Sequence, residues 1–187
     1  MTWILTQSGQ QFDLLRPTAS MIKPPDIAPA LSRLCRFNGH TRAHYSVAQH
    51  SMIVASLVPA EHQLVALLHD ATEAYIGDMT RPLKAVLPEY QYVEHQIWLA
   101  VCERFDIQSD LPPCVKQADM VALATERRDL MPAHPGVWDC LAGIQPMPEV
   151  IVPLPAEYAS AAFFSQLMAL MQAKHRHYHN QPIFEGI

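Results

Sequence analysis

The 187-residue sequence has few cysteines, and their spacing follows no common pattern. Its four cysteines, Cys35, Cys102, Cys114 and Cys140, include no Cys-x-x-Cys pair. This spacing predicts neither a zinc ribbon nor a disulfide framework. The simplest interpretation is a protein of a reducing intracellular compartment.

The sequence also has little positive charge and no long apolar run. Its 13 Lys and Arg face 18 Asp and Glu, which gives a formal net charge of −5. This balance argues against general binding to a nucleic-acid polymer, although one nucleotide can still bind in a locally basic pocket. The N-terminus lacks the basic start of a signal peptide, and no stretch approaches 18 uninterrupted apolar residues. We therefore expect a cytoplasmic protein with no membrane span.

Half of the residues are hydrophobic, and the length suits a single domain covering residues 1–187. Most of the chain carries apolar residues at helical spacing, which predicts an all-α helical bundle. Alternating residues on both sides of Ser8-Gly9 predict a small N-terminal β-hairpin over residues 2–15. The core is expected over about residues 20–130. A Pro-rich segment, 131–156, follows it, either packed over the domain or forming a mobile flap.

The expected helices are bounded by capping residues, prolines and glycine. Asp26 is predicted to cap a helix that starts near Ile27 and stops at Asn38-Gly39, and Ser46 to cap the next one. The remaining predicted helices cover residues 46–58, 61–75, 82–87, 90–105, 115–130 and 157–175.

Three polar residues follow an apolar run at the end of the predicted helix 61–75. His69 and Asp70 come directly after Leu67-Leu68, and Glu73 follows three residues after Asp70. Burying such groups without partners is costly, and a divalent metal offsets that cost because imidazole and carboxylate are natural ligands. Neighbouring helical residues point about 100° apart, so His69 and Asp70 can reach one ion. The alternative is a helix end with a hydrogen-bonded core histidine and two solvated acids.

Two further polar residues lie on apolar helix faces. His50 is on the inner side of the helix 46–58, and Asp119 lies within an otherwise apolar helix. Taken alone, His50 is more often a hydrogen-bonded core residue, and Asp119 more often part of a buried salt bridge with Arg127 or Arg128.

Together these residues form a series of His, His-Asp and Asp along the chain. The sequence resembles the HD-domain phosphohydrolase superfamily, and within it the bacterial HD-domain 5′-deoxynucleotidases and phage-type relatives such as dATP triphosphohydrolases. The likeness covers about residues 20–130. The motifs that carry it are Tyr45-Ser-Val-Ala-Gln-His50-Ser51, His69-Asp-Ala-Thr-Glu73-Ala-Tyr-Ile-Gly-Asp78 and Val115-Lys-Gln-Ala-Asp119. Two further stretches resemble the phage-type branch: Arg33 to His40 and Ala124-Thr-Glu-Arg-Arg-Asp129.

The resemblance implies one divalent metal ion, which could be Mn, Co, Zn, Fe, Ni or Mg. It implies four ligands: His50, His69, Asp70 and Asp119. By position, Glu73 corresponds to the residue that activates water, and Asp78 to a second acid near the leaving group. It also implies a homo-oligomer.

Candidate substrate-binding residues are cationic or lie near the motifs. Related nucleotidases contact the nucleotide through an Arg followed by an aromatic residue, and Arg36-Phe37 is the counterpart here. Lys84, His40 and Arg33 are further candidates, although Arg33 also fits a solvated helix face. Trp3, Trp98 and Trp138 are interpreted as packing residues rather than base-stacking platforms.

The expected function is metal-dependent hydrolysis of a deoxynucleotide. Removal of phosphate from a monophosphate and removal of triphosphate from a triphosphate such as dATP both remain open. The alternatives are a non-catalytic nucleotide or metal sensor and a phosphodiesterase of the same superfamily. An intact Glu73 argues against the sensor.

Overall fold

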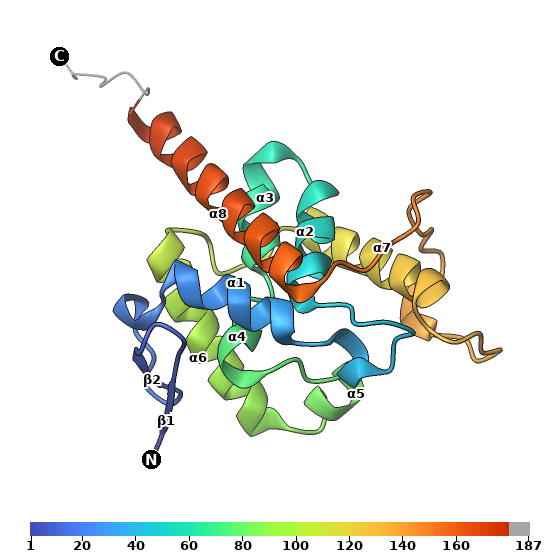
Figure 1. The fold of residues 1–187 in the computed structure, drawn as a ribbon, viewed down its shortest axis with the longest axis horizontal. Helices are drawn as coiled ribbons and strands as arrows, with labels where there is room; N and C mark the ends of the chain where they lie inside the picture. Colours follow the sequence, from blue (N-terminus) through green and yellow to red (C-terminus); the bar gives the residue numbers. More distant parts are fainter. Residues whose placement is uncertain (180–187) are drawn as a thin grey trace.

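The computed structural model describes residues 1–179 and confirms the expected fold class, an all-α bundle with a small N-terminal hairpin (Figure 1). The predicted domain also includes residues 180–187, which lie outside the described residues. Three of the long helices begin with a proline at the first helical positions, two or three residues before the predicted starts. Proline suits this position because its fixed φ is helical and its missing N–H is not needed there. The helical elements are η1 (Ala19–Met21), α1 (Pro24–Arg33), η2 (Arg36–Gly39), α2 (Val47–Ser56), η3 (Ala60–His62), α3 (Gln63–Leu68), α4 (Glu73–Ile76), α5 (Arg81–Lys84), α6 (Pro88–Phe105), α7 (Pro113–Asp129), η4 (Asp139–Leu141) and α8 (Ala156–His179).

The predicted hairpin is present, with β1 (Trp3–Leu5) antiparallel to β2 (Gln11–Asp13). The ring of Phe12 is fully buried and stacks on Tyr75 with ring centroids 3.9 Å apart. The assignment of Asp26 as a helix cap is wrong, since α1 begins earlier and Asp26 lies in its first turn. Its carboxylate instead accepts hydrogen bonds from the hairpin loop, at 2.8 Å from the Thr6 hydroxyl and 2.7 Å from the Ser8 backbone N–H.

The first helix is shorter than the sequence predicts, because it ends at Arg33 rather than at Asn38-Gly39. The chain then becomes extended, and Cys35 forms an isolated antiparallel bridge with Ser46. The backbone N–H of Arg36 donates to the carbonyl of Tyr45 at 2.9 Å. This long-range pairing satisfies backbone groups that a continued helix would have paired internally.

The continuous helix expected over 61–75 is also wrong. It is divided into η3, α3 and α4, with a turn at residues 69–72 between the last two. Through the turn the backbone makes tight i to i−3 hydrogen bonds, such as Ala71 N to Leu68 O at 2.8 Å. Such bonds tighten a helical turn and change the direction of the chain. Here the change of direction falls at His69 and Asp70.

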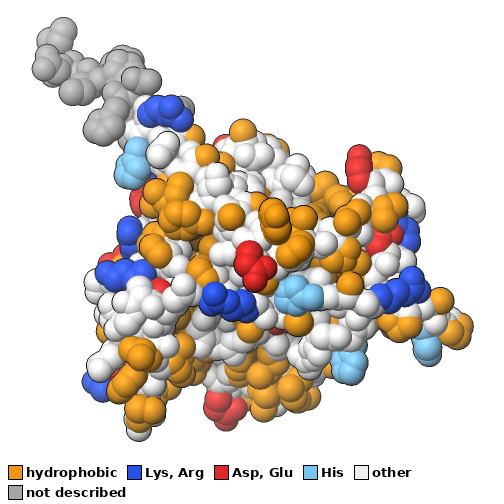
Figure 2. Space-filling view, in the orientation of Figure 1, with side chains coloured by type: hydrophobic (Ala, Val, Ile, Leu, Met, Phe, Trp, Pro, Cys, Tyr) orange, Lys and Arg blue, Asp and Glu red, His pale blue; other side chains and the backbone are white. Residues whose placement is uncertain are grey.

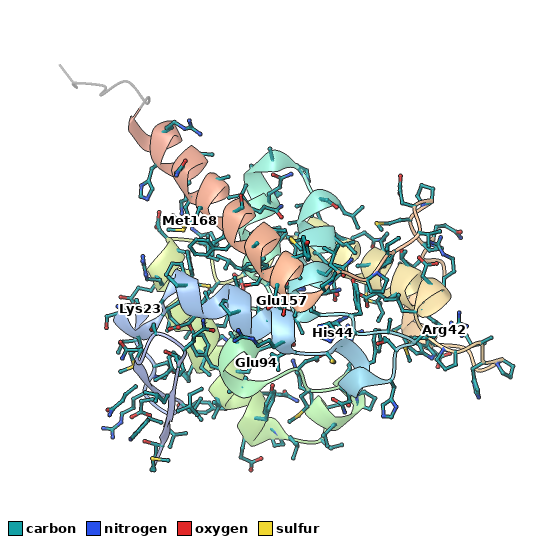
Figure 3. The ribbon with its side chains drawn as sticks, viewed as in Figure 1. Lys23, Arg42, His44, Glu94, Glu157 and Met168 are labelled. Atoms are coloured by element: carbon teal, nitrogen blue, oxygen red, sulfur yellow. The ribbon has the colours of Figure 1, made fainter. Side chains whose placement is uncertain are left out.

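A single large apolar cluster lies between the helices, and α8 packs against α1, α2 and α3. Figure 1 shows α8 running across the body and projecting beyond it at its C-terminal end. In Figure 3, Glu157 marks its start and Met168 lies further along it. The helix reaches His179, past the predicted end at 175, because no Gly or Pro occurs between its start at Ala156 and Pro182.

The Pro-rich segment is packed over the domain rather than detached from it. The Gln49 side chain donates to the carbonyl of Val152 at 2.8 Å and accepts from the N–H of Leu154 at 2.8 Å. Arg42 donates its backbone N–H to the carbonyl of Leu130 at 3.0 Å, and it lies beside the end of α7 in Figure 3. These bonds tie α2 to the C-terminal part of the segment and tie the loop before α2 to the end of α7, where the segment begins.

None of the helices in the described residues is long and apolar enough to cross a membrane. On the face shown in Figure 2, Lys and Arg side chains are separated by hydrophobic and uncharged surface.

Asp129 provides a test of how the Pro-rich segment packs against α7. Its carboxylate accepts from Arg128 at 2.6 and 2.8 Å and from the N–H of Ile151 at 2.9 Å. The hydrogen bond from Arg128 is the main reason that the pKa of Asp129 is lowered. We predict that Asp129→Asn lowers the free energy of unfolding at pH 7 by about 1 kcal/mol.

A lowered native pKa means that the ionised form stabilises the fold. The difference between Asp129→Asn and wild type should therefore be complete above the unfolded-state pKa of about 3.9, and should disappear as pH falls through the native pKa. Urea unfolding at several pH values measures it, with the exposed Asp110→Asn as control. An equal loss in both variants would contradict the assigned anchoring.

Candidate metal centre

His50 comes from the first turns of α2. The Ser46 side chain caps this helix by accepting a hydrogen bond from the Gln49 N–H at 3.2 Å, as the sequence predicts. His50 is fully buried. Its Nδ1 lies 2.6 Å from a carboxylate oxygen of Glu126 on α7. Because that oxygen accepts, Nδ1 carries the single proton of the neutral imidazole, and the lone pair of Nε2 is directed away from Glu126.

His69 and Asp70 lie in the turn between α3 and α4. The Nδ1 atom of His69 donates to the carbonyl of Ala66 at 2.8 Å, which again leaves Nε2 with its lone pair. The imidazoles of His50 and His69 face one another with ring centroids 5.3 Å apart.

The side chains from these separate elements converge on one point. Asp70 Oδ2 lies 3.2 Å from His69 Nε2 and 3.5 Å from His50 Nε2. Asp119 Oδ1, from α7, lies 3.2 Å from His50 Nε2. The ligand atoms of His50, His69 and Asp119 all lie within 4.8 Å of one another. The described residues therefore contain a group with the geometry to hold a metal ion.

The chemistry of this group also fits a metal. Neither His50 Nε2 nor His69 Nε2 has a hydrogen-bond partner among the described residues, although carboxylates lie close to both. Buried polar nitrogens are normally paired. Two imidazole lone pairs and two carboxylates around one point form the mixed N/O donor set that binds Mn, Fe, Co, Ni or Zn.

The two aspartates remain ionised in this setting. Burial raises the pKa of each carboxyl, but the neighbouring imidazoles outweigh burial, His69 for Asp70 and His50 for Asp119. The pKa values of both aspartates are therefore lowered, and both are available as anionic ligands.

The pKa of His50 shifts in the opposite direction, upward. Burial and the charge of Arg36 lower the pKa of His50, but Glu126 and Asp119 outweigh them and raise it to about 9. A metal ion must therefore displace a proton from His50 at neutral pH.

Glu126 is a site residue that the sequence analysis missed. It is fully buried and accepts hydrogen bonds from the Tyr45 hydroxyl at 2.9 Å, His50 at 2.6 Å and Arg36 at 3.2 Å. Burial raises the pKa of this carboxyl, but Arg36 and His50 outweigh burial and lower it. Two signals were available: Glu126 lies within the stretch 124–129 that resembles the phage-type branch, and it lies seven residues, or two turns, after Asp119 on the same helix face.

Glu73 and Asp78 lie close to the cluster, one at the start of α4 and the other just past its end. Gly77 ends α4 with φ of 81°, a conformation that favours glycine, and Asp78 follows it. Burial raises the pKa of both acids, and the negative charges of Asp70 and Asp78 add to the effect on Glu73. Glu73 Oε2 is buried with no hydrogen-bond partner among the described residues.

A cavity of about 730 Å³ opens beside the cluster, a volume typical of small-molecule sites. Asp70, Glu73, Asp78 and Asp119 contribute to its wall. Its other lining residues include four predicted substrate-binding residues, Arg36, Phe37, His40 and Lys84.

The structure does not bring the fifth candidate, Arg33, to this cavity. Arg33 is exposed at the end of α1, where its guanidinium donates to the Gln7 side chain at 2.9 Å. The early end of α1 separates it from Arg36, so only Arg36 turns inward. Arg33 therefore fits the solvated helix face that the sequence analysis also considered.

The cations at the cavity differ in how firmly they are held. Lys84 forms a 2.6 Å ion pair with Glu94 on α6. Arg81 is 62% exposed and lies 3.7 Å from Asp119, so it is the cation freest to move. Arg36 is 14% exposed and lies between Glu126 and Asp78, which are 3.2 and 4.0 Å away.

The fold and the cluster define an all-α protein with a candidate metal centre at a cavity. A comparison with models of known protein families finds no match. The chain is 39% identical to the uncharacterized protein YfdR of Escherichia coli over 176 residues, which cover 93% of this chain and 98% of YfdR. It is 38% identical over 126 residues to an uncharacterized protein of Rhodobacter capsulatus, covering 62% of this chain and 64% of that protein. The chain belongs to the same family as YfdR.

The contact between Glu126 and His50 gives a prediction. Glu126→Gln retains the shape but removes the charge that orients His50. We expect the affinity for Mn²⁺ or Co²⁺ to fall about 10- to 100-fold, as for other carboxylates behind metal-bound histidines. Calorimetric titration of metal-stripped protein measures it, with the exposed Glu103→Gln on α6 as control. Unchanged affinity in a folded Glu126→Gln variant would contradict this role.

Proposed function

We propose that this protein is an HD-domain phosphohydrolase that uses one divalent metal ion to hydrolyse a deoxynucleotide. The observation that carries the proposal is a pair of imidazole nitrogens, His50 Nε2 and His69 Nε2, that have no hydrogen-bond partner among the described residues. They lie beside Asp70 and Asp119, two carboxylates of the cavity wall. His50, His69, Asp70 and Asp119 would hold the ion.

Hydrolysis of a phosphate ester needs a nucleophile and a way to neutralise charge on the phosphoryl oxygens. A divalent ion, when bound, supplies positive charge for the phosphoryl group and lowers the pKa of water. The overall reaction consumes one water molecule: its oxygen forms the new bond to phosphorus, and the bond from phosphorus to the leaving oxygen breaks.

Two acids of this chain are placed to move the protons. Glu73 would accept the proton of the attacking water through Oε2, which has no other partner among the described residues. Asp78 would donate a proton to the leaving oxygen. Burial raises the pKa values of both acids, so Asp78 is a ready proton donor and ionised Glu73 is a stronger base than an exposed glutamate.

The phosphate would be held by the cations of the cavity. The Nε of Arg36 is buried and lacks a hydrogen-bond partner among the described residues, so this guanidinium retains a donor for an anion. Arg81 is exposed enough to move onto a phosphate from its position near Asp119. Lys84 would contribute charge while paired with Glu94.

The substrate is a monophosphate or a triphosphate of a deoxynucleoside, and the products distinguish the two. Purified protein is stripped of metal, reloaded with each of Mn²⁺, Co²⁺, Fe²⁺, Ni²⁺, Zn²⁺ and Mg²⁺, and assayed on all the deoxynucleoside mono- and triphosphates. A 5′-deoxynucleotidase releases inorganic phosphate from dAMP, whereas a triphosphohydrolase releases inorganic triphosphate from dATP. Binding without turnover across the whole panel would replace this proposal with a nucleotide or metal sensor.

Variants at two acids separate chemistry from metal binding. We predict that Glu73→Gln retains the metal but lowers kcat at least about 100-fold, because it removes the proton acceptor. Asp119→Ala should lose both the metal and activity. Metal content by elemental analysis and kcat on the best substrate measure the two effects. A fully active Glu73→Gln variant would show that the assigned role of Glu73 is wrong.

A further inference from the structure

An aromatic residue of the Pro-rich segment lies on the cavity wall. Trp138, directly before η4, lines the cavity together with Phe37 of η2. The two ring centroids are 6.2 Å apart and the rings are tilted by 45°. Trp138 is only partly buried, so its ring is not enclosed in the core as a packing residue would be.

The position of Trp138 is set by α7. The guanidinium carbon of Arg127 lies 5.1 Å from the centre of the Trp138 ring, within range of a cation–π interaction. Arg127 also donates to the carbonyl of Gly136, two residues before Trp138. Because α7 also carries Asp119, one helix fixes the tryptophan and a residue of the candidate metal centre.

Phe37 reaches the cavity through an unfavourable backbone. Its φ and ψ are 55° and 34°, and Asn38 is also left-handed at φ of 51°. L-residues rarely adopt this conformation, and where the surrounding structure holds them in it the reason is often functional. Arg36 lies 5.4 Å from the centre of the Phe37 ring, so the aromatic residue adjoins the cation that faces Asp78.

The cavity therefore combines a charged region with an aromatic one. The lining of the cavity also includes Leu123, Met131 and Cys140, which offer little for hydrogen bonding to the edge of a base. Flat π-surfaces bind heterocyclic bases by stacking, and they tolerate different bases because every base has a π-face.

We propose that Trp138 is a specificity-determining residue that stacks on the nucleobase of the substrate, opposite or beside Phe37. This inference rests on the proposed function, which places the phosphate at the His–Asp cluster. Recognition is by stacking rather than by base-edge hydrogen bonds, so all four bases bind and the larger purines bind more tightly.

Ligand binding to a variant that is expected not to hydrolyse its substrate tests the proposal. In metal-loaded Glu73→Gln protein, the affinities for dAMP and for base-free 2-deoxyribose 5-phosphate are measured by calorimetry. Adding Trp138→Ala should weaken dAMP binding about 10- to 100-fold and leave 2-deoxyribose 5-phosphate unchanged. Trp138→Phe should recover most of the dAMP affinity. The exposed neighbour Val137→Ala is the matched control and should change neither ligand.

The outcomes separate this inference from the proposed function. The stacking role is overturned if Trp138→Ala, with an unaltered thermal unfolding curve, loses the same affinity for both ligands or loses affinity for neither. Turnover of dAMP by wild-type protein with base-independent affinity would overturn this inference alone. Base-dependent affinity that relies on Trp138, without turnover of any nucleotide by wild-type protein, would overturn the hydrolase and retain the stacking site.

Discussion

The ionised carboxylate of Glu126 is the constraint on which the rest of the site depends. It has no exposed surface, and burying an unpaired charge is prohibitive, so it must be surrounded by donors. Arg36, Tyr45 and His50 supply them, all from the stretch 36–50, which is distant in sequence from Glu126. Because Glu126 bonds to Nδ1 of His50, the other ring nitrogen, Nε2, is directed toward Asp70 and Asp119. Glu126 also holds Arg36 inward, at the cavity wall.

The long helices form a frame, and some of the site residues lie where short elements interrupt it. The turn at 69–72 presents His69 and Asp70, and the left-handed residues of η2 present Phe37. Neither segment continues a regular helix, so each can direct side chains toward a neighbour that is distant in sequence. The helices α2 and α7 supply His50 and Asp119 from positions that are rigid because their other faces are in the core.

Sequence patterns predicted the frame because its causes are local. Period-2 alternation around Ser8-Gly9 predicted the hairpin, and the Ser46 cap predicted the start of α2. The prolines at the starts of α1, α6 and α7 could have corrected the predicted boundaries, since the preference for proline there is a property of the first helical turn. The interruption at 69–72 had no such local signal, because His69 bonds to a backbone carbonyl only in the folded turn. Arg33 and Arg36 could not be told apart without the position at which α1 ends.

The sequence by itself determined the all-α class, the hairpin and a short set of acids and histidines on apolar faces, since all of these follow from periodicity and residue chemistry. The resemblance of the sequence already implied that His50, His69, Asp70 and Asp119 share one ion. Only the tertiary structure decided that Glu126 joins His50 to Arg36 and that Trp138 reaches the cavity. The physical reason is that those contacts join residues up to 101 positions apart, from Phe37 to Trp138. Contacts between residues so far apart in sequence form because buried charges must be paired and apolar faces must be buried in the same fold. No local sequence pattern predicts them.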